Sequence, residues 1–437
     1  MPFEAIDLEL SRRSHHTATA VRDQAFAPLA GATSCDVAIV GGGLAGLSAA
    51  IDLRQRGLDV VLLEAHAVGS GASGRNGGQA AYGLASDQDR IESQLGLADA
   101  KRVWSMTIEA LDLLKQRIAE HRIACDWQPG VLNLARSASK GRALKVWADR
   151  IESVYGYSFE RIGPDAMGRW IASSRYHSGI HDPRSGHLHP LKYTLGLARA
   201  AAAAGVRLHE QSTVISIQQG PTAVLRTSEG EVRAKQVLLA ANVYLRGLAP
   251  AISSRIMPVG TYIGCTEALP KSLADSLIPS RAAVTDTNFV LDYFRTTADQ
   301  RMLYGGRVSY STLTPRNLAQ GMRRRMLRTF PQLEGWRLEY AWGGFVDITM
   351  NRAPDFGRLP ACAGEAQNVY YVQGFSGHGL ALTGLAGRLV AEAMTGDAGR
   401  FDTFARLRHR PFPGGARLRT PALVLGMLWF RLRDILA

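Results

Sequence analysis

Lysine is scarce in this chain. Only seven of the 51 lysine and arginine residues are lysines, and none follows Lys271. Arginine therefore supplies most of the formal net charge of +13, which is compatible with an anionic substrate, a nucleic acid or an anionic membrane surface. Because no basic helix–turn–helix, zinc finger or RNA-binding aromatic motif accompanies the charge, we do not expect nucleic acid as a partner.

Cysteine is also rare, which excludes a disulfide framework and a cysteine-based metal cage. The four cysteines lie far apart and form no C-x-x-C pair; they are Cys35, Cys125, Cys265 and Cys362. This usage is typical of reduced thiols in a reducing compartment, so we expect a cytoplasmic protein.

Long apolar runs are absent: none reaches the roughly 18 residues of a membrane span. No apolar segment follows Arg12-Arg13, so neither a secretory nor a twin-arginine signal is expected. Residues 417–437 combine an apolar run with arginines. Two interpretations stay open: a basic amphipathic helix lying on the inner face of a membrane, or a terminal helix docked on the core or on another subunit.

A dinucleotide-binding pattern occupies the region after the first 33 residues. An apolar strand, Val37–Val40, is followed by the G-x-G-x-x-G turn Gly41–Gly46, a helical segment, and a second apolar strand, Val60–Leu63. The first glycine permits the tight turn, the second lets a pyrophosphate approach the backbone, and the third lets helix and strand pack closely. The phosphates would bind at the helix N-terminus, and Glu64 is placed to accept a hydrogen bond from a ribose hydroxyl.

Two further glycine-rich blocks can bind negative charge. Ser70–Gln79 (SGASGRNGGQ) exposes successive backbone N–H groups, which can form an anion nest. Gly374–Gly379 (GFSGHG) opens a helix of small residues, and the positive end of a helix dipole favours an anion there.

Together these three blocks resemble the superfamily of FAD-dependent amine oxidoreductases that includes D-amino-acid oxidase, glycine oxidase and sarcosine oxidase. The resemblance implies an α/β FAD-binding domain of the Rossmann-like, glutathione-reductase-like type, interleaved with an α+β substrate domain built on an antiparallel sheet. The expected division is an arm over residues 1–33, an FAD-binding domain over 34–115, 183–252 and 346–437, and a substrate domain over 116–182 and 253–345.

The resemblance also implies which residues hold FAD, including a strand whose backbone meets the adenine and a helix start that faces the flavin pyrimidine ring. The expected set is Gly41, Gly43, Leu44, Ala45, Gly46, Glu64, Ala65, Gly71, Ala72, Ser73, Arg75, Asn76, Gly77, Gly78, Gln79, Val214, Ala240, Asn242, Gly374, Ser376, Gly377, His378, Gly379 and Leu380. Some relatives attach the flavin through a cysteine or histidine, but Ser70–Gly78 and Trp342–Gly344 contain neither, so we expect non-covalent FAD.

Catalytic and substrate residues are expected from the second sheet and its edges. The candidates near the reacting atoms are His378, Tyr304 and Trp342, and the candidates for substrate contact are His189, Tyr262, Arg295, Arg307 and Ala381. Tyr262, Tyr304 and Trp342 are expected to wall an apolar channel, although aromatic residues on strands are often core. His187 and His189 have a spacing that could suggest a metal, but no third ligand is evident, so no metal is expected.

Within the superfamily, the chain resembles the members that oxidise γ-glutamylputrescine. The similar stretches are Ser185–Pro190, Asn288–Arg295, Ala298–Gly306 and Pro411–Gly415. The implied reaction transfers hydride from an amine-bearing carbon to flavin; hydrolysis of the imine then gives an aldehyde and ammonia, and O2 gives H2O2. Sarcosine-oxidase relatives hold the substrate α-carboxylate with a lysine at the position of Ala381, so its absence favours a longer amine.

Two alternatives stay open. The first is a dehydrogenase with the same amine chemistry that passes electrons to a quinone or a carrier protein instead of O2; the basic, apolar C-terminus motivates it. The second is a non-catalytic flavoprotein that binds a partner or RNA, which rests on net charge alone. The oligomeric state does not follow from these patterns.

Overall fold

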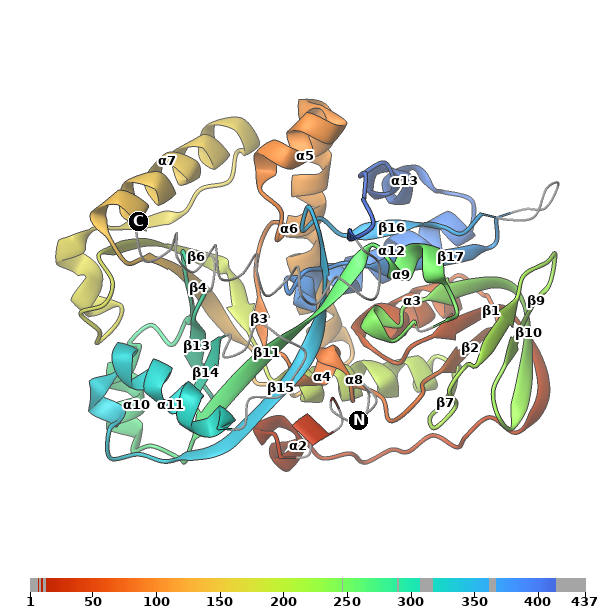
Figure 1. Cartoon of the computed structure of the whole chain (residues 1–437), viewed down its shortest axis with the longest axis horizontal. Coiled ribbons are helices and arrows are strands. Elements are labelled where there is room, and N and C mark those ends of the chain that lie inside the picture. Colours follow the sequence, from red (N-terminus) through yellow and green to blue (C-terminus); the bar gives the residue numbers. More distant parts are fainter. Residues whose placement is uncertain are drawn as a thin grey trace.

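Two β-sheets organise the molecule (Figure 1). The computed structural model describes residues 7, 9–10, 13–245, 247–288, 291–306, 317–360 and 367–413. In Figure 1 one sheet lies on the right and the other on the left.

The first sheet has eight strands and is parallel at its centre. β1 pairs in parallel with β2 and β10, and β10 pairs in parallel with β17. The main order is β16-β17-β10-β1-β2-β7, and the hairpin β8-β9 attaches to β10 in antiparallel fashion. The bounds are β1 Gly31–Val40, β2 Val60–Leu63, β7 Arg207–His209, β8 Ser216–Gln218, β9 Ala223–Arg226, β10 Gly230–Leu239, β16 Asp355–Arg358 and β17 Val369–Gln373.

Helices cover this sheet closely, which explains why the C-terminal ends of its central strands β1 and β10 are apolar and buried. Val37–Val40 is buried at every position. Small residues let α3 and α12 cross near each other: a Cβ added at Gly387 would lie 2.5 Å from the Ala49 amide nitrogen. The helices around the sheet are α3 Leu44–Gln55, α6 Leu97–Glu120, α8 Pro190–Ala203, α9 Pro250–Ser253, α12 Gly379–Met394 and α13 Gly399–Ala405.

The second sheet has nine strands in the main order β15-β11-β14-β13-β12-β4-β6-β3, with β5 on β6. Its pairs are antiparallel except β4 and β12, which are parallel, so the expectation of an antiparallel sheet is wrong for this pair. The physical reason is the connection: parallel neighbours need a long crossover, and about 150 residues separate β4 from β12. The bounds are β3 Gln79–Ala80, β4 Gln128–Ala135, β5 Glu160–Ile162, β6 Ser178–His187, β11 Ile256–Thr266, β12 Ala283–Asp286, β13 Tyr293–Thr296, β14 Met302–Gly306 and β15 Leu338–Thr349.

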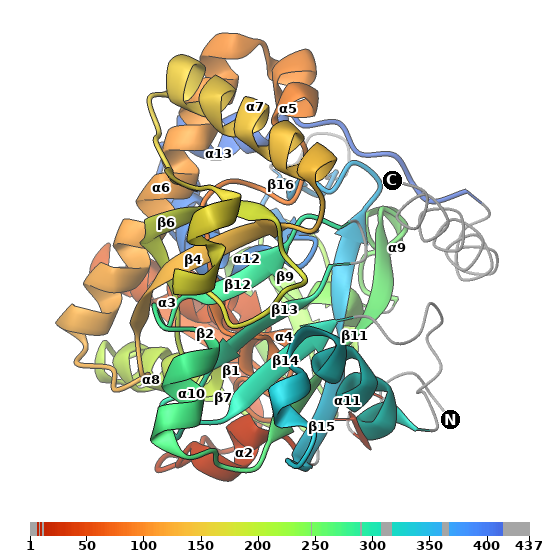
Figure 2. The ribbon, with the colours of Figure 1, turned by 90° about the vertical axis from the view of Figure 1, so that its left-hand side faces the viewer.

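The second sheet has two differently covered faces. Figure 2 views it from the outside, where α7, α10 and α11 lie toward the viewer. The opposite face packs on the loop that follows β2. The outer elements are α7 Ala138–Tyr155, η1 Pro164–Arg169, α10 Lys271–Leu277, α11 Leu318–Thr329 and η3 Pro331–Leu333.

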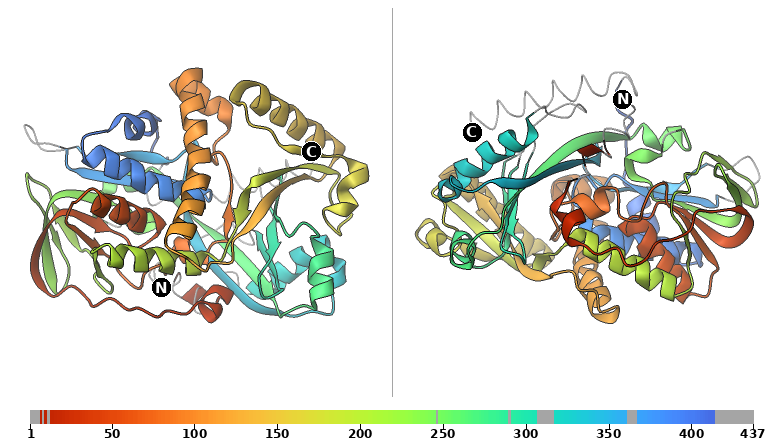
Figure 3. Two further views of the ribbon diagram at one scale, coloured as in Figure 1. Left: turned by 180° about the vertical axis from the view of Figure 1, so that it is seen from behind. Right: turned by 90° about the horizontal axis from the view of Figure 1, so that it is seen from below.

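Between the sheets stands α6, which the view from behind in Figure 3 shows as the upright orange helix. The sequence pattern predicts one helix over residues 89–121. The structure has two, α5 (Gln88–Leu95) and α6, because Gly96 adopts φ +79° and breaks the helix. In the described part of the chain, no helix is both long and apolar enough to cross a membrane.

Candidate cofactor site

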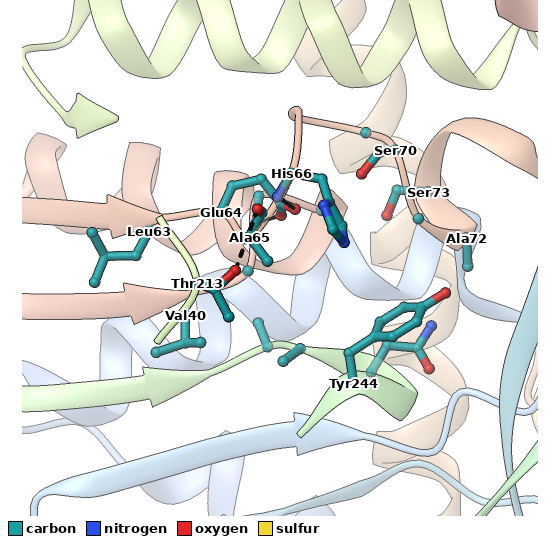
Figure 4. A pocket seen from close by; sticks show the side chains of 18 of the residues that line it. Val40, Leu63, Glu64, Ala65, His66, Ser70, Ala72, Ser73, Thr213 and Tyr244 are labelled. Atoms are coloured by element: carbon teal, nitrogen blue, oxygen red, sulfur yellow. Dashed lines mark hydrogen bonds between the residues drawn. The ribbon is translucent and has the colours of Figure 1, made fainter. Parts of the chain in front are cut away.

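A cavity lies at the carboxyl ends of β1 and β2, where open parallel sheets bind ligands. Figure 4 shows side chains from several separate segments pointing into it. The lining residues are Asp7, Val40, Gly41, Gly42, Gly43, Leu63, Glu64, Ala65, His66, Gly69, Ser70, Gly71, Ala72, Ser73, Arg75, Ser212, Thr213, Val214, Ala240, Ala241, Asn242, Tyr244 and Leu248.

The glycine turn after β1 forms the floor of the cavity. Gly41 adopts φ +116°, and a Cβ there would lie 2.6 Å from the Ala240 carbonyl oxygen. A Cβ at Gly46 would overlap the Gly41 carbonyl oxygen. Gly46 therefore lies behind the floor with Leu44 and Ala45, and these three residues shape the turn without lining the cavity.

Glu64 ends β2 at the cavity wall. Its Oε2 accepts from the Gly42 amide at 2.7 Å, and its Oε1 accepts from the His66 amide at 2.9 Å. Burial raises the pKa of this carboxyl, while the two amide hydrogen bonds lower it. The carboxylate is thus fixed beside the glycine turn, where it can accept a hydrogen bond from a sugar hydroxyl.

The loop after β2 continues the wall and ties the cavity to the N-terminal arm. The Arg75 guanidinium forms an ion pair with Asp7 at 2.9 Å, and the Tyr244 hydroxyl donates to the same carboxylate at 2.5 Å. Ser73 Oγ accepts from the Leu44 amide at 3.0 Å, so this loop also caps the first turn of α3. The small helix in the loop is α4, Ala72–Arg75, and Tyr244 belongs to η2, Asn242–Tyr244.

Three polar atoms in this wall fit a bound polar ligand. Arg75 Nε, Asp7 Oδ1 and Asn242 Oδ1 are buried and have no hydrogen-bond partner among the described residues. All three residues line the cavity. Buried polar groups are normally satisfied, so these atoms fit the phosphate and sugar groups of a dinucleotide.

Asn76, Gly77, Gly78 and Gln79 do not line this cavity, and the side chains of Asn76 and Gln79 hold the loop in place. Asn76 Nδ2 donates to the Ala72 and Ser73 carbonyls, and its Oδ1 accepts from the Gly78 amide. Gln79 bonds to β12 through the Val284 carbonyl and the Thr285 hydroxyl.

The turn Gly374–Gly379 joins β17 to α12. Gly374, Ser376 and Gly377 have φ values of +76°, +54° and +83°, the left-handed region. The His378 ring donates through Nε2 to the Tyr82 carbonyl at 2.8 Å, and burial lowers its pKa. This bond brings the third sequence block to the segment that follows Gln79.

Asp347 at the end of β15 anchors that turn. Its Oδ2 accepts from the Gly374 amide at 2.5 Å, and its carbonyl accepts from the Ser376 amide at 3.0 Å. Burial raises the pKa of the Asp347 carboxyl to about 7. The sequence analysis missed this residue; the available signal was an acid within the apolar stretch Trp342–Ile348.

The aromatic candidates do not share one wall, so that expectation is wrong. Trp342 packs with Ile263 and Leu303 on the face toward the loop Ser70–Gln79, which we call the flavin loop after its expected role. The Trp342 Nε1 donates to the Arg75 carbonyl at 2.9 Å. Tyr262 and Tyr304 belong to the core on the other face, under α11. Ile263 is the cross-strand partner of Trp342, so their side chains lie on the same face of the sheet. Because adjacent residues of a strand point to opposite faces, the Tyr262 side chain lies on the other face.

Arg295 is committed to the backbone. Its Nε donates to the Gly77 carbonyl at 2.7 Å and its Nη2 to the Leu188 carbonyl at 3.0 Å, and burial lowers its pKa to about 10. The guanidinium thus fastens the flavin loop instead of facing the main cavity. Arg307 lies outside the described residues.

His189 and Ala381 are both buried. His189 caps α8 by accepting from the Lys192 amide at Nδ1. Ala381 lies in the first turn of α12, within the hydrophobic core. Neither residue lines the main cavity.

Residues Asp7 and Tyr244 were also missed by sequence reasoning. They reach the cavity from segments that are more than 230 residues apart. No local pattern marks them, because their role depends on the folded position of the arm. The three described cysteines, Cys35, Cys125 and Cys265, are buried free thiols, and Cys362 lies outside the described residues.

Comparisons with known proteins agree with this geometry. The family model described as FAD dependent oxidoreductase matches residues 36–393. The chain is 42% identical to γ-glutamylputrescine oxidoreductase of Escherichia coli (strain K12) over 422 residues, which cover 96% of this chain and 98% of that protein. It is 36% identical to a probable oxidoreductase, OrdL, of Haemophilus influenzae, covering 97% of each chain.

Solved structures show the same fold at low sequence identity. Glycine oxidase from Bacillus cereus superposes with a TM-score of 0.70 at 20% identity, covering 86% of this chain and 99% of that chain. Glycine oxidase from Geobacillus kaustophilus gives a TM-score of 0.68 at 21% identity, covering 83% and 95%.

Proposed function

Because the chain belongs to the family of FAD-dependent oxidoreductases, we propose that it oxidises a γ-glutamylated polyamine of the γ-glutamylputrescine kind. The observation that carries the proposal is the 42% identity, over nearly the full length of both chains, to a γ-glutamylputrescine oxidoreductase. In the proposed reaction a carbon bearing an amine loses a hydride and the amine nitrogen loses a proton, which leaves an imine, and water converts the imine to an aldehyde and ammonia. O2 takes two electrons and two protons and becomes H2O2.

FAD, when bound, supplies the two-electron acceptor for this chemistry. The chain's own residues would hold it: Glu64 would accept a hydrogen bond from the ribose, and the amides of the two glycine turns and Arg75 would bind the phosphates. The N-terminal end of α12 would stabilise negative charge on the flavin through its dipole. His378 stays neutral and donates to Tyr82, so it acts in our proposal through the shape and polarity of this turn.

The absence of a lysine clamp supports a long amine. Position 381 is a buried alanine, and no lysine follows Lys271. A substrate whose carboxylate lies far from the reacting carbon has no need of a cation at this position. A γ-glutamyl group has that arrangement.

Anaerobic reduction of the bound flavin tests the substrate class. We expect γ-glutamylputrescine to bleach the flavin faster than free putrescine, N-methyl amino acids or D-amino acids. Bleaching by N-methyl amino acids with none by γ-glutamylated amines would overturn the proposal. This assay needs no electron acceptor, so its result is independent of the reoxidation step.

The electron acceptor needs its own measurement. We propose O2, and the competing possibility is a quinone or a carrier protein. The basic segment 417–437 that suggested a membrane-bound acceptor lies outside the described residues. One H2O2 per aldehyde under air is the result expected for an oxidase, whereas slow reoxidation by O2 would favour a dehydrogenase.

We also propose that FAD is held without a covalent bond. A histidine could in principle attach the flavin, and His16 lies beside Trp342, with ring centroids 5.1 Å apart. Its Nε2, however, donates to the Asn76 carbonyl. Mass spectrometry of the denatured protein should give the mass of the bare chain. A chain carrying the mass of FAD would contradict this.

A further inference from the structure

Three buried histidines meet where the N-terminal arm crosses the start of α8. His15 and His16 begin α2 (His15–Thr19), and His189 precedes α8. One ring nitrogen from each lies within 4.8 Å of those of the other two. The sequence analysis considered His187 and His189 as a pair and found no third ligand. In the structure the arm supplies two further histidines beside His189, and His187 is not part of the cluster.

Two of these rings present a ring nitrogen with no partner. His15 Nε2 faces the Asp299 carboxylate at 3.1 Å, and His16 Nε2 donates to the Asn76 carbonyl at 3.0 Å. The Nδ1 atoms of both rings are buried and have no hydrogen-bond partner among the described residues. A carboxylate or carbonyl on one ring nitrogen, with the other nitrogen available, is the arrangement that orients metal-binding histidines.

His189 completes the group through Nε2. This atom lies 3.0 Å from the Thr19 hydroxyl, which itself donates to the His15 carbonyl. The His189 Nδ1 accepts from the Lys192 amide at 3.2 Å. Metal binding at Nε2 therefore moves the ring proton to Nδ1 and replaces both of these hydrogen bonds.

Charged side chains surround the cluster and affect its affinity for a cation. Arg295 and Lys192 line the neighbouring cavity and oppose a cation, whereas Asp126, which pairs with Lys192, and Asp299 line the same cavity and favour one.

Space for a fourth ligand lies next to the cluster. A cavity of about 90 Å³ is lined by His15, His189, Thr19, Asp126 and Asp299, among others. It is polar and large enough for an ordered water molecule.

We propose that His15, His16 and His189 bind a zinc-like divalent transition metal, with water as the fourth ligand. Three imidazole donors and an open position suit Zn2+, and the all-nitrogen set excludes Mg2+ and Ca2+. The ion would fasten the arm to α8 and, through His16 and Asn76, to the flavin loop. The proposal does not depend on the identity of the substrate.

Cobalt binding tests the site directly. Holoenzyme without a polyhistidine tag is freed of metal with a chelator and titrated with Co2+, whose tetrahedral absorption bands lie at longer wavelength than those of oxidised flavin. We expect one Co2+ per chain, four-coordinate bands, and their loss when Zn2+ is added. No uptake, or uptake without those bands, overturns the proposal.

Variants then locate the ion. H15Q, H16Q and H189Q should each bind Co2+ at least about tenfold more weakly, and D299N, which alters the support of His15, about tenfold more weakly. H181Q is the matched control, because His181 pairs with Glu160 on the second sheet away from the cluster. Unchanged binding in H16Q or H189Q overturns the assignment.

A variant that misfolds would also lose metal, so the ligands are also counted in the unmodified protein. X-ray absorption at the zinc edge counts the imidazole ligands of the bound ion. Three imidazoles support the proposal, and fewer than three overturn it.

Discussion

Single residues decide how tightly the proposed cofactor is held, and Glu64 is the clearest case. It is buried at the cavity wall and already fixed by two amides, so it meets a ribose without reorganisation. A hydrogen bond to a charged acceptor contributes about 1.5–3 kcal/mol.

We therefore expect E64Q to weaken FAD binding by roughly 10–100-fold. Quenching of FAD fluorescence during titration of the apoprotein measures the dissociation constant. E92Q is the control, because Glu92 pairs with Arg150 on the surface of α5 and α7. An unchanged dissociation constant in E64Q would show that the carboxylate does not touch the cofactor.

Asp347 predicts a pH effect on stability. Its pKa is raised to about 7 in the folded chain, so between its ordinary value and pH 7 the folded state binds more protons than the unfolded state. Its contribution to stability is therefore present at low pH and is lost as pH rises through 7. D347N keeps an oxygen for the Gly374 amide and removes this dependence.

From about pH 5 to about pH 8, we expect the stability of D347N relative to the unmodified protein to rise by about 2–3 kcal/mol. Denaturant unfolding at both pH values measures the difference. A difference that stays constant with pH would mean that the carboxyl is not half-protonated near neutrality.

At this scale, sequence reasoning succeeds where a residue's role follows from its position in a local motif. Glu64 ends the second strand of the motif, and it lines the cavity as that position implies. Asp7 and Tyr244 could not be predicted, because their meeting with Arg75 depends on the path of the whole arm.

Helices and strands pack closely where glycine allows it, and the start of α3 against the glycine turn after β1 is a clear example. Gly46 lies in the first turn of α3, where any side chain would overlap the Gly41 carbonyl and approach Ile39. The glycine turn and the helix cannot both keep their places if a methyl group is added.

We expect G46A to fold with little or no FAD and with a lower melting temperature. The absorbance ratio of flavin to protein and a thermal scan of the apoprotein check this. G168A in η1 is the control, since nothing lies within 4 Å of a Cβ there. A G46A protein with full FAD content would contradict the close packing.

Periodicity predicted most helices and strands, but it did not predict which side chains of different strands lie on the same face of the sheet. Tyr262 and Tyr304 lie in segments whose sequence pattern predicts strands, yet the face that each side chain occupies relative to Trp342 depends on the register between strands far apart in sequence. A shift of one residue reverses a face, and the sequence carries no register information across such gaps. The parallel pair β4 and β12 was missed for a related reason, because pairing partners are set by the path of the chain.

At the scale of the whole molecule, helices from distant parts of the chain meet at one buried ion pair. Arg117 on α6 and Asp52 on α3 lie 2.5 Å apart, and both side chains are 3% exposed. Arg117 also donates to Ser48, which donates to the Gly384 carbonyl on α12.

We expect R117M to lower the free energy of unfolding by about 3–5 kcal/mol, because Asp52 is left buried with only Arg388, 3.7 Å away, to offset it. Adding D52N should restore part of the loss. R102M, which breaks an exposed pair with Asp99, should cost less than about 1 kcal/mol. Urea unfolding compares the variants, and equal losses for R117M and R102M would contradict the burial argument.

The position of β17 and α12 has a consequence for synthesis. β17 pairs with β10, and α12 packs on α3 over the same sheet as β1. Both β17 and α12 come after residue 368 in the sequence. A ribosome delivers β1 and its glycine turn early, while these two neighbours emerge only when most of the chain has been made. The nascent polypeptide therefore carries an apolar sheet edge for much of translation, a state prone to aggregation that chaperones protect.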